Sequence, residues 1–154
     1  MSLTVYCAGP ITGGDYRSVL SYFERTKQAL EGCGMDIVAL HPMVGREHLL
    51  RSDEAAESVV VDGGPICTPQ AIFQRDRWMI RRSDVVYLNL AAADRVSIGT
   101  CMELAIANTL GKHTVLVMPE GSCHRHAFVL AAADIIFNSE DGALDYLVVL
   151  AEGC

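Results

Sequence analysis

The sequence predicts an α/β fold, in which a mostly parallel sheet is flanked by helices in a Rossmann-like or flavodoxin-like arrangement. Short apolar runs alternate along the chain with segments whose apolar residues recur at helical spacing. Apolar strands that alternate with helices are typical of parallel sheets covered on both faces. The length of 154 residues and the hydrophobic content of 51% suit one sizeable core. We therefore expect residues 1–154 to form a single domain.

The first half of the chain contains two predicted strands and one predicted helix. Residues 3–8 form an apolar run that ends at Gly9, which predicts a buried strand followed by a turn. Residues 15–32 show helical apolar spacing, and residues 36–40 form a second strand-like run. Residues 42–69 are polar and irregular, and they are longer than an ordinary connection. Loops of this length inside compact domains usually have a function or are disordered.

The second half continues the alternation of helix and strand. Thr68 is a suitable N-cap and Pro69 suits a first helical turn, so a helix is predicted to begin there. In chain order, the predicted elements are a helix at 69–82, a strand at 84–90, a helix at 98–110, a strand at 113–118, a strand at 135–137 and a helix at 139–151. Ligands of such sheets bind beyond the carboxyl ends of the strands, which directs attention to the segments that follow them.

Composition and charge argue against several classes of protein. The net charge of -7 does not suit a nucleic-acid polymer as partner, because such proteins usually carry a basic face. No apolar run reaches the roughly 20 residues that a membrane span needs. The first residues lack the basic and apolar regions of a signal peptide, so we expect a cytoplasmic protein. The six cysteines are scattered without a C-x-x-C pair, and we expect free thiols.

Three segments carry residues that suit chemistry. The turn after the first strand contains Gly9 and Gly13, and its backbone N–H groups could bind a phosphate or a hydroxyl. This turn fits neither the dinucleotide-binding nor the P-loop pattern, and a plain strand-to-helix turn is the alternative. Glu103 lies near the start of a helix, where the macrodipole favours a carboxylate, although such an acid often only supports the helix. Asp76 stands between two arginines, which is also typical of a surface ion pair.

Together these segments resemble the nucleoside 2-deoxyribosyltransferase family, which includes deoxynucleoside 5'-monophosphate N-glycosidases and cytidylate-type N-glycosidases. The resemblance spans Tyr6 to about Pro119, and each motif is loose while their combination is more specific. The motifs are Tyr6 with Gly9-Pro10, Asp76 before Ser83-Asp84-Val85-Val86, Gly99 to Glu103-Leu104, and Gly111-Lys112-His113-Thr114-Val115.

The resemblance implies a reaction and a role for three residues. Glu103 would attack the anomeric carbon and form a glycosyl-enzyme, Asp76 would protonate or orient the leaving base, and Tyr6 would hydrogen-bond Glu103. The sugar would then pass to water in an N-glycosidase or to another base in a transferase. This is the chemistry of retaining glycosidases, whose two carboxyl groups lie about 5–5.5 Å apart. The resemblance further implies a homodimer or higher homo-oligomer without a cofactor.

Ser97 departs from the pattern of the transferases, which tend to have an aspartate at this position, whereas the nucleotide N-glycosidases have serine. A carboxylate would repel a 5'-phosphate, while a hydroxyl at a helix N-terminus can donate to one. Thr12, Gly13 and the backbone around Gly99 could supply further donors. The resemblance and the electrostatics therefore favour a nucleoside 5'-monophosphate. The alternative is that Ser97 only caps the helix.

Other residues are less informative. His41 follows the second strand at the edge of the site and could contact base or sugar, but a structural histidine is equally consistent. Trp78 could stack on a base, but we expect it to pack in the core. The run from Cys123 to His126 contains metal-binding residue types, yet further ligands at suitable spacing are missing, and we expect no metal. In the resembling family, residues near this run can complete the site of a neighbouring subunit.

Two other functions remain open. A nucleotide-sensing module of related fold would keep the pocket without turnover, but it would not need Tyr6, Asp76 and Glu103 together. A phosphate-handling enzyme on a doubly wound sheet would be expected to carry a Walker lysine or an acidic metal cluster, and the sequence offers neither.

Overall fold

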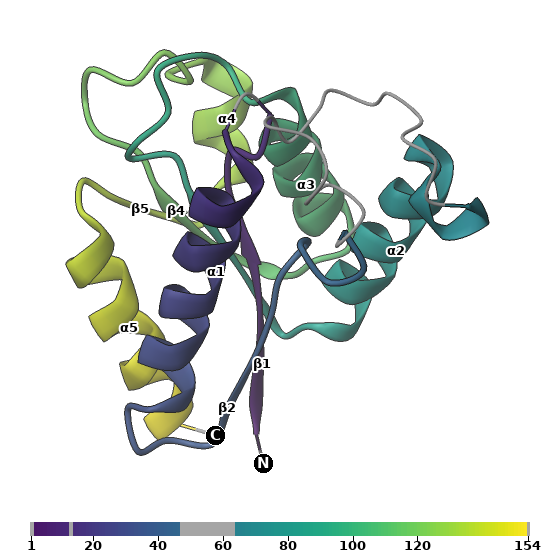
Figure 1. Cartoon of the computed structure of the whole chain (residues 1–154). Coiled ribbons are helices and arrows are strands. Elements are labelled where there is room, and N and C mark those ends of the chain that lie inside the picture. Colours follow the sequence, from purple (N-terminus) through teal and green to yellow (C-terminus); the bar gives the residue numbers. More distant parts are fainter. Residues whose placement is uncertain (1, 13, 47–63, 154) are drawn as a thin grey trace.

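The computed structural model describes residues 2–12, 14–46 and 64–153, which fold around one five-stranded sheet (Figure 1). All strand pairs are parallel, and the strand order is β2-β1-β3-β4-β5. This is the flavodoxin-like order, so the predicted fold class is confirmed. The strands are β1 (Leu3–Ala8), β2 (Ile37–Leu40), β3 (Val85–Asn89), β4 (His113–Val117) and β5 (Ile135–Phe137).

Helices cover both faces of the sheet, as expected for parallel strands. One face packs against α1 (Tyr16–Glu31) and α5 (Glu140–Glu152), which lie side by side in Figure 1. The other face packs against α2 (Pro69–Arg82), α3 (Ile98–Thr109) and α4 (Ala127–Ala132).

Alternation along β1 decides which of its side chains reach each layer. Val5 and Cys7 pack in the cluster under α1 and α5. Tyr6 and Ala8 belong to the cluster under α2 and α3, because successive strand residues point to opposite faces. Tyr6 therefore lies on the same side of the sheet as the helices that carry Asp76 and Glu103.

Local capping explains where several helices begin. The Thr68 hydroxyl accepts a hydrogen bond from Ala71 N at 3.1 Å, so the predicted N-cap of α2 is confirmed. Nδ1 of His126 accepts a hydrogen bond from Phe128 N at 3.2 Å and begins α4. Helix α4 was not predicted, because it spans only six residues and its apolar sequence has no clear period.

The predicted loop at 42–69 lies largely outside the described residues. Its described end contains a 3-10 turn, η2 (Pro65–Cys67), which was not predicted and leads directly into α2. Among the described residues, no helix is long and apolar enough to cross a bilayer. The five described cysteines are free.

Candidate active site

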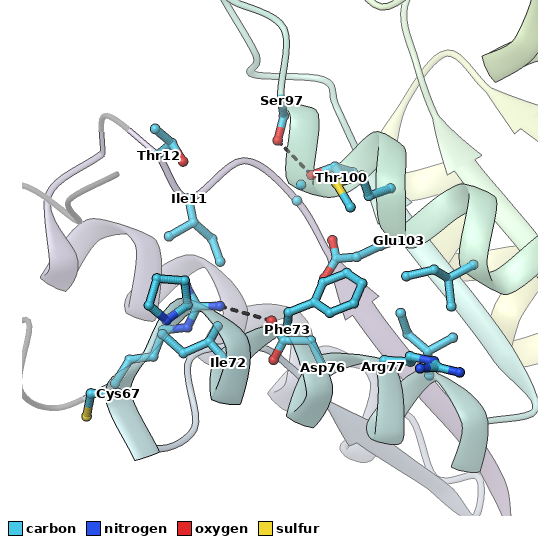
Figure 2. Close-up of a pocket in the computed structure, with 17 residues that line it drawn as sticks. Ile11, Thr12, Cys67, Ile72, Phe73, Asp76, Arg77, Ser97, Thr100 and Glu103 are labelled. Carbon is cyan, nitrogen blue, oxygen red and sulfur yellow. Dashed lines mark hydrogen bonds and ion pairs between the residues drawn. The ribbon is translucent and has the colours of Figure 1, made fainter. Parts of the chain in front are cut away.

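A pocket with a cavity of about 250 Å³ opens beside the carboxyl ends of β1 and β3 (Figure 2). At this point the strand order changes direction, which is where flavodoxin-like folds bind ligands. The turn after β1, the inner face of α2 and the first turns of α3 form its walls. Its apolar side includes Ile11, Ile72, Phe73, Ile80, Met102 and Ile106, and its polar groups include Thr12, Arg46, Asp76, Ser97, Thr100 and Glu103.

Glu103 projects from α3 into the pocket, and the side chain of Tyr6 on β1 fixes its position. The Tyr6 hydroxyl donates a hydrogen bond to Glu103 Oε1 at 2.6 Å. Tyr6 is completely buried within β1, so its ring cannot change direction without disturbing the core. The phenol therefore fixes one carboxyl oxygen of Glu103 and leaves the other available to a ligand.

Asp76 enters the same pocket from α2 and is 8% exposed (Figure 2). Nη2 of Arg46 lies 3.0 Å from its Oδ2, and Nε of Arg75 lies 3.8 Å from its Oδ1. The alternative of a solvent-exposed ion pair is therefore wrong for Asp76, because its two arginine contacts form in a largely buried site.

Burial dominates the electrostatics of both carboxyl groups. Removal from water raises the pKa of Glu103 to about 8, and the nearby Asp76 contributes to the rise while the Tyr6 hydrogen bond opposes it. Burial also raises the pKa of Asp76 to about 6, and Arg46 and Arg75 limit this shift. Carboxyl groups with raised pKa values in a cavity are typical of acid–base catalytic sites. Near neutral pH the pair holds about one proton.

The first turn of α3 forms the polar end of the pocket. The Ser97 hydroxyl lies 2.9 Å from the Thr100 hydroxyl, and within the described part of the chain it makes no capping hydrogen bond to the helix backbone. A Cβ atom on Gly99 would have no neighbour within 4 Å, so the backbone there faces open space. Ser97 thus occupies the N-cap position of α3 without a side-chain capping hydrogen bond, and it lines the pocket together with Gly99 and Thr100.

The turn after β1 approaches the neighbouring strand closely. A Cβ atom on Gly9 would lie 3.2 Å from the backbone oxygen of Asn89, which leaves little room for any side chain. Gly9 and Thr12 both line the pocket, with Thr12 exposed on the side opposite Asp76 in Figure 2. Gly13 lies outside the described residues, so its predicted role has no structural counterpart here.

His41 does not join these residues. It is absent from the described lining of the pocket, and its ring stacks on Phe23 with centroids 5.7 Å apart. Its Nε2 lies 3.2 Å from Glu24 Oε1, while burial lowers its pKa. Of the two interpretations of His41, the structural one agrees with this position.

The structure also places Trp78 and the run at 123–126. Trp78 is 55% exposed, with the Arg82 guanidinium 4.7 Å from its ring centroid, so the prediction that it packs in the core is wrong. In the run at 123–126, Nε2 of His124 accepts the backbone N–H of Ser97, while His126 caps α4. Among the described residues, no group of three potential ligands is placed to hold a metal ion.

Several pocket residues were not identified from the sequence, although their spacing carried a signal. Phe73 and Ile80 stand three residues before and four residues after Asp76 in the same helix, and residues at these spacings share a face. Thr100 stands three residues after Ser97, the spacing of a reciprocal cap. Arg46 lies in the irregular segment, where an arginine could approach a phosphate but is usually solvated, and no spacing indicated its contact with Asp76.

Three solved structures share this fold. A 2-deoxyribosyltransferase from Bacillus psychrosaccharolyticus has 20% identity and a TM-score of 0.64, with 93% of this chain and 91% of that chain covered. A conserved protein from Enterococcus faecalis V583 has 13% identity and a TM-score of 0.67, with 97% and 99% covered. A CMP N-glycosidase from Clostridium botulinum has 17% identity and a TM-score of 0.57, with 96% and 98% covered.

At these identities the structural likeness establishes the fold alone. No curated protein matches the sequence. A sequence family described as nucleoside 2-deoxyribosyltransferase, however, matches residues 5–142. This range includes all three segments that form the pocket, from the turn after β1 to the first turns of α3. The chain thus belongs to the nucleoside 2-deoxyribosyltransferase family.

Proposed function

We propose that this protein cleaves the N-glycosidic bond of a nucleoside 5'-monophosphate through a covalent glycosyl-enzyme on Glu103. The observation that carries the proposal is the 2.6 Å hydrogen bond from Tyr6 to Glu103, which aims a carboxyl group into a pocket shared with Asp76. A purely binding module would gain nothing from two carboxyl groups with raised pKa values in one cavity. Family membership supports the same reaction class.

The reaction needs one electron pair and one proton from the two carboxyl groups. An ionised Glu103 oxygen forms a bond to the anomeric carbon as the bond from that carbon to the base nitrogen breaks. The base leaves with the proton that the pair holds near neutral pH, and Asp76 is the group assigned to deliver it. In the second half, water or a second base attacks the anomeric carbon, Glu103 leaves as a carboxylate, and the proton of the attacking group returns to the pair.

The first turn of α3 favours a phosphate at the far end of the substrate. The hydroxyls of Ser97 and Thr100 and the open backbone at Gly99 provide donors without a carboxylate among them. Phosphate oxygens accept hydrogen bonds from such groups, and the helix dipole adds a favourable partial charge. A free nucleoside would leave these donors to water.

A chromatographic screen tests the function. The protein is incubated with ribo- and deoxynucleosides and their 5'-monophosphates, with and without a second free base. We expect free base from monophosphates, and none of it with Glu103→Ala, which should still bind the substrate. Release without an added base identifies water as the acceptor, whereas exchange that requires a second base identifies a transferase. Binding without turnover by the wild-type protein would instead support a nucleotide-sensing module.

We also propose that the protein forms a homodimer or higher homo-oligomer. Helix α3 is apolar on its outer side as well, where Ile98 is 71% exposed, and Phe128 on α4 is 80% exposed. Helices α3 and α4 pack against each other, and exposed apolar surface of this kind is typical of subunit interfaces. Light scattering should show an oligomer that Phe128→Asp weakens, while Val149→Asp on α5, also exposed, leaves it intact. A monomeric wild-type protein would contradict the proposal.

A further inference from the structure

The buried imidazole of His124 contacts Ser97, the pocket residue on which the proposed preference for a 5'-monophosphate over a free nucleoside depends. Its Nε2 accepts the backbone N–H of Ser97 at 2.7 Å, although the two residues lie in different loops. His124 is 2% exposed, and burial lowers its pKa, so the neutral ring that this contact requires is the favoured one. With Nε2 as acceptor, the ring proton belongs on Nδ1, which faces the Ser122 hydroxyl at 3.4 Å and Cys123 Sγ at 3.5 Å.

We propose that His124 is a positioning residue for the phosphate of the substrate: by accepting the Ser97 N–H, it holds the first turn of α3 so that the Ser97 hydroxyl faces the pocket. This inference rests on the proposed function for its consequence, but the hydrogen bond itself can be tested separately. The role differs from a metal site and from a contribution to a neighbouring subunit, because the imidazole points into its own chain.

The contact has a second effect on the donors at this end of the pocket. The N–H group of Ser97 donates to His124, while the hydroxyls of Ser97 and Thr100 share one hydrogen bond in which either can be the donor. The Ser97 N–H is therefore unavailable to a ligand, whereas the backbone N–H groups of the following turn and the hydroxyl proton that the Ser97–Thr100 pair does not use can face one. Loss of the imidazole would leave a partly buried N–H without its acceptor, and the turn would move to satisfy it.

Glu103 is held by different contacts, so the two ends of the pocket respond separately. Its carboxyl group is fixed by Tyr6 of β1, and α3 is anchored beyond it by buried Leu104 and Ala107. A change at His124 should displace the first turn of α3 and leave the carboxyl group in place. The predicted consequence is a loss of phosphate binding without a matching loss of the chemical step.

Kinetics of three variants test this consequence. We expect His124→Leu to raise KM for the monophosphate about 10-fold, with kcat within about 3-fold of wild type and KM for the free nucleoside unchanged. His124→Gln, whose side-chain oxygen can accept the same N–H, should restore KM to within about 3-fold. The matched control is His126→Leu. It also removes a histidine that accepts a backbone N–H, here that of Phe128 in α4, and it should leave KM unchanged. Equal losses on both substrates, or no loss with His124→Leu, would overturn the proposal.

Nuclear magnetic resonance tests the hydrogen bond without reference to activity. In the ¹⁵N-labelled full chain, we expect a scalar coupling between the Ser97 amide nitrogen and an unprotonated His124 Nε2, and we expect it to vanish in His124→Gln. A protonated Nε2 or an absent coupling would overturn the inference even if the enzyme is active. If the wild-type protein shows the coupling but cleaves no substrate, the proposed function fails and the contact at His124 stands.

Discussion

Two carboxyl groups that share one cavity cannot titrate independently, and this governs the chemistry at the scale of single residues. The pKa of Asp76 is raised to about 6 and that of Glu103 to about 8, so the free protein favours the proton on Glu103. The proposed attack needs the opposite distribution, with an ionised Glu103 and a protonated Asp76. Both arrangements belong to the same singly protonated pair, and the reaction draws on the second. Tyr6 favours it, because its hydroxyl donates to the carboxylate.

A bell-shaped pH dependence follows from this shared proton. Below about pH 6 both groups are protonated and no nucleophile exists, while above about pH 8 both are ionised and no acid exists. We expect kcat/KM for the monophosphate to be highest between these values. In Asp76→Asn, kcat/KM should fall about 10²–10⁴-fold and the basic limb should disappear. A wild-type profile that rises steadily from pH 5 to 9 would contradict the shared proton.

Substitution of Ser97 tests the proposed preference for a 5'-monophosphate. A carboxylate in place of its hydroxyl would bring a negative charge to the proposed phosphate site, whereas a free nucleoside carries no charge to repel. We expect Ser97→Asp to lower kcat/KM for the monophosphate about 10–100-fold and to change the value for the nucleoside little. Ser97→Ala is the control, because it removes the hydroxyl without adding charge and should cost less. An unchanged substrate preference in Ser97→Asp would remove the argument for a phosphate.

At the scale of elements, the site depends on how the turn after β1 meets the end of β3. Gly9 faces the Asn89 backbone oxygen so closely that an added Cβ would lie 3.2 Å from it, and that oxygen belongs to a strand that cannot easily move. The turn can approach β3 only because residue 9 lacks a side chain. This approach brings Gly9 and Thr12 to the same pocket as the start of α3.

Gly9→Ala should therefore damage both the fold and the pocket. We expect the free energy of unfolding to fall by about 1–3 kcal/mol, because the new methyl group must be accommodated by a backbone shift. Turnover should fall at least about 10-fold, because a backbone shift in a turn that lines the pocket misplaces the bound substrate. Gly121→Ala is the control, since its Cβ would have no neighbour within 4 Å. Denaturation and kinetics that match wild type in Gly9→Ala would show that the turn tolerates a side chain.

Sequence periodicity was sufficient to predict most of the helices and strands. Each of the five strands was predicted close to its observed bounds, because buried parallel strands are short apolar runs between polar segments. Helix α2 carried an additional signal at Thr68, whose capping role needs only local geometry. Helix α4 was missed because it is short and is capped by His126, a residue type that is not among the preferred N-caps.

At the scale of the whole molecule, the candidate site is the meeting point of three distant segments. Tyr6, Asp76 and Glu103 were predicted from motifs, and the sheet order brings β1 and β3 together at the switch point where these residues converge. The contact of His124 with Ser97 could not be predicted, because it joins two loops that no periodicity relates. Trp78 was expected in the core but is exposed. Nothing in the sequence indicated that its ring would lie against the Arg82 guanidinium instead.

The electrostatic cost of the site should be visible in the stability of the whole protein. The usual pKa of a glutamate is near 4.5, whereas that of Glu103 is raised to about 8 in the folded chain. As pH rises between these values, the unfolded chain ionises this residue more readily than the folded chain does. The free energy of unfolding therefore falls through this window and levels off above it, by about 1–2 kcal/mol after allowance for the partial exposure of Glu103.

Glu103→Gln tests this cost, because the amide keeps an acceptor for the Tyr6 hydroxyl but cannot ionise. We expect the variant to be inactive, to match wild type in stability near pH 4.5, and to exceed it above pH 8. Urea denaturation at pH 5, 7 and 8.5 measures the difference, with Glu120→Gln as a control at an exposed glutamate. A gain in stability that grows with pH would mean that the fold maintains a destabilising acid for its chemistry. Parallel pH profiles for the wild type and the variant would show that Glu103 ionises as readily in the folded chain as in the unfolded one.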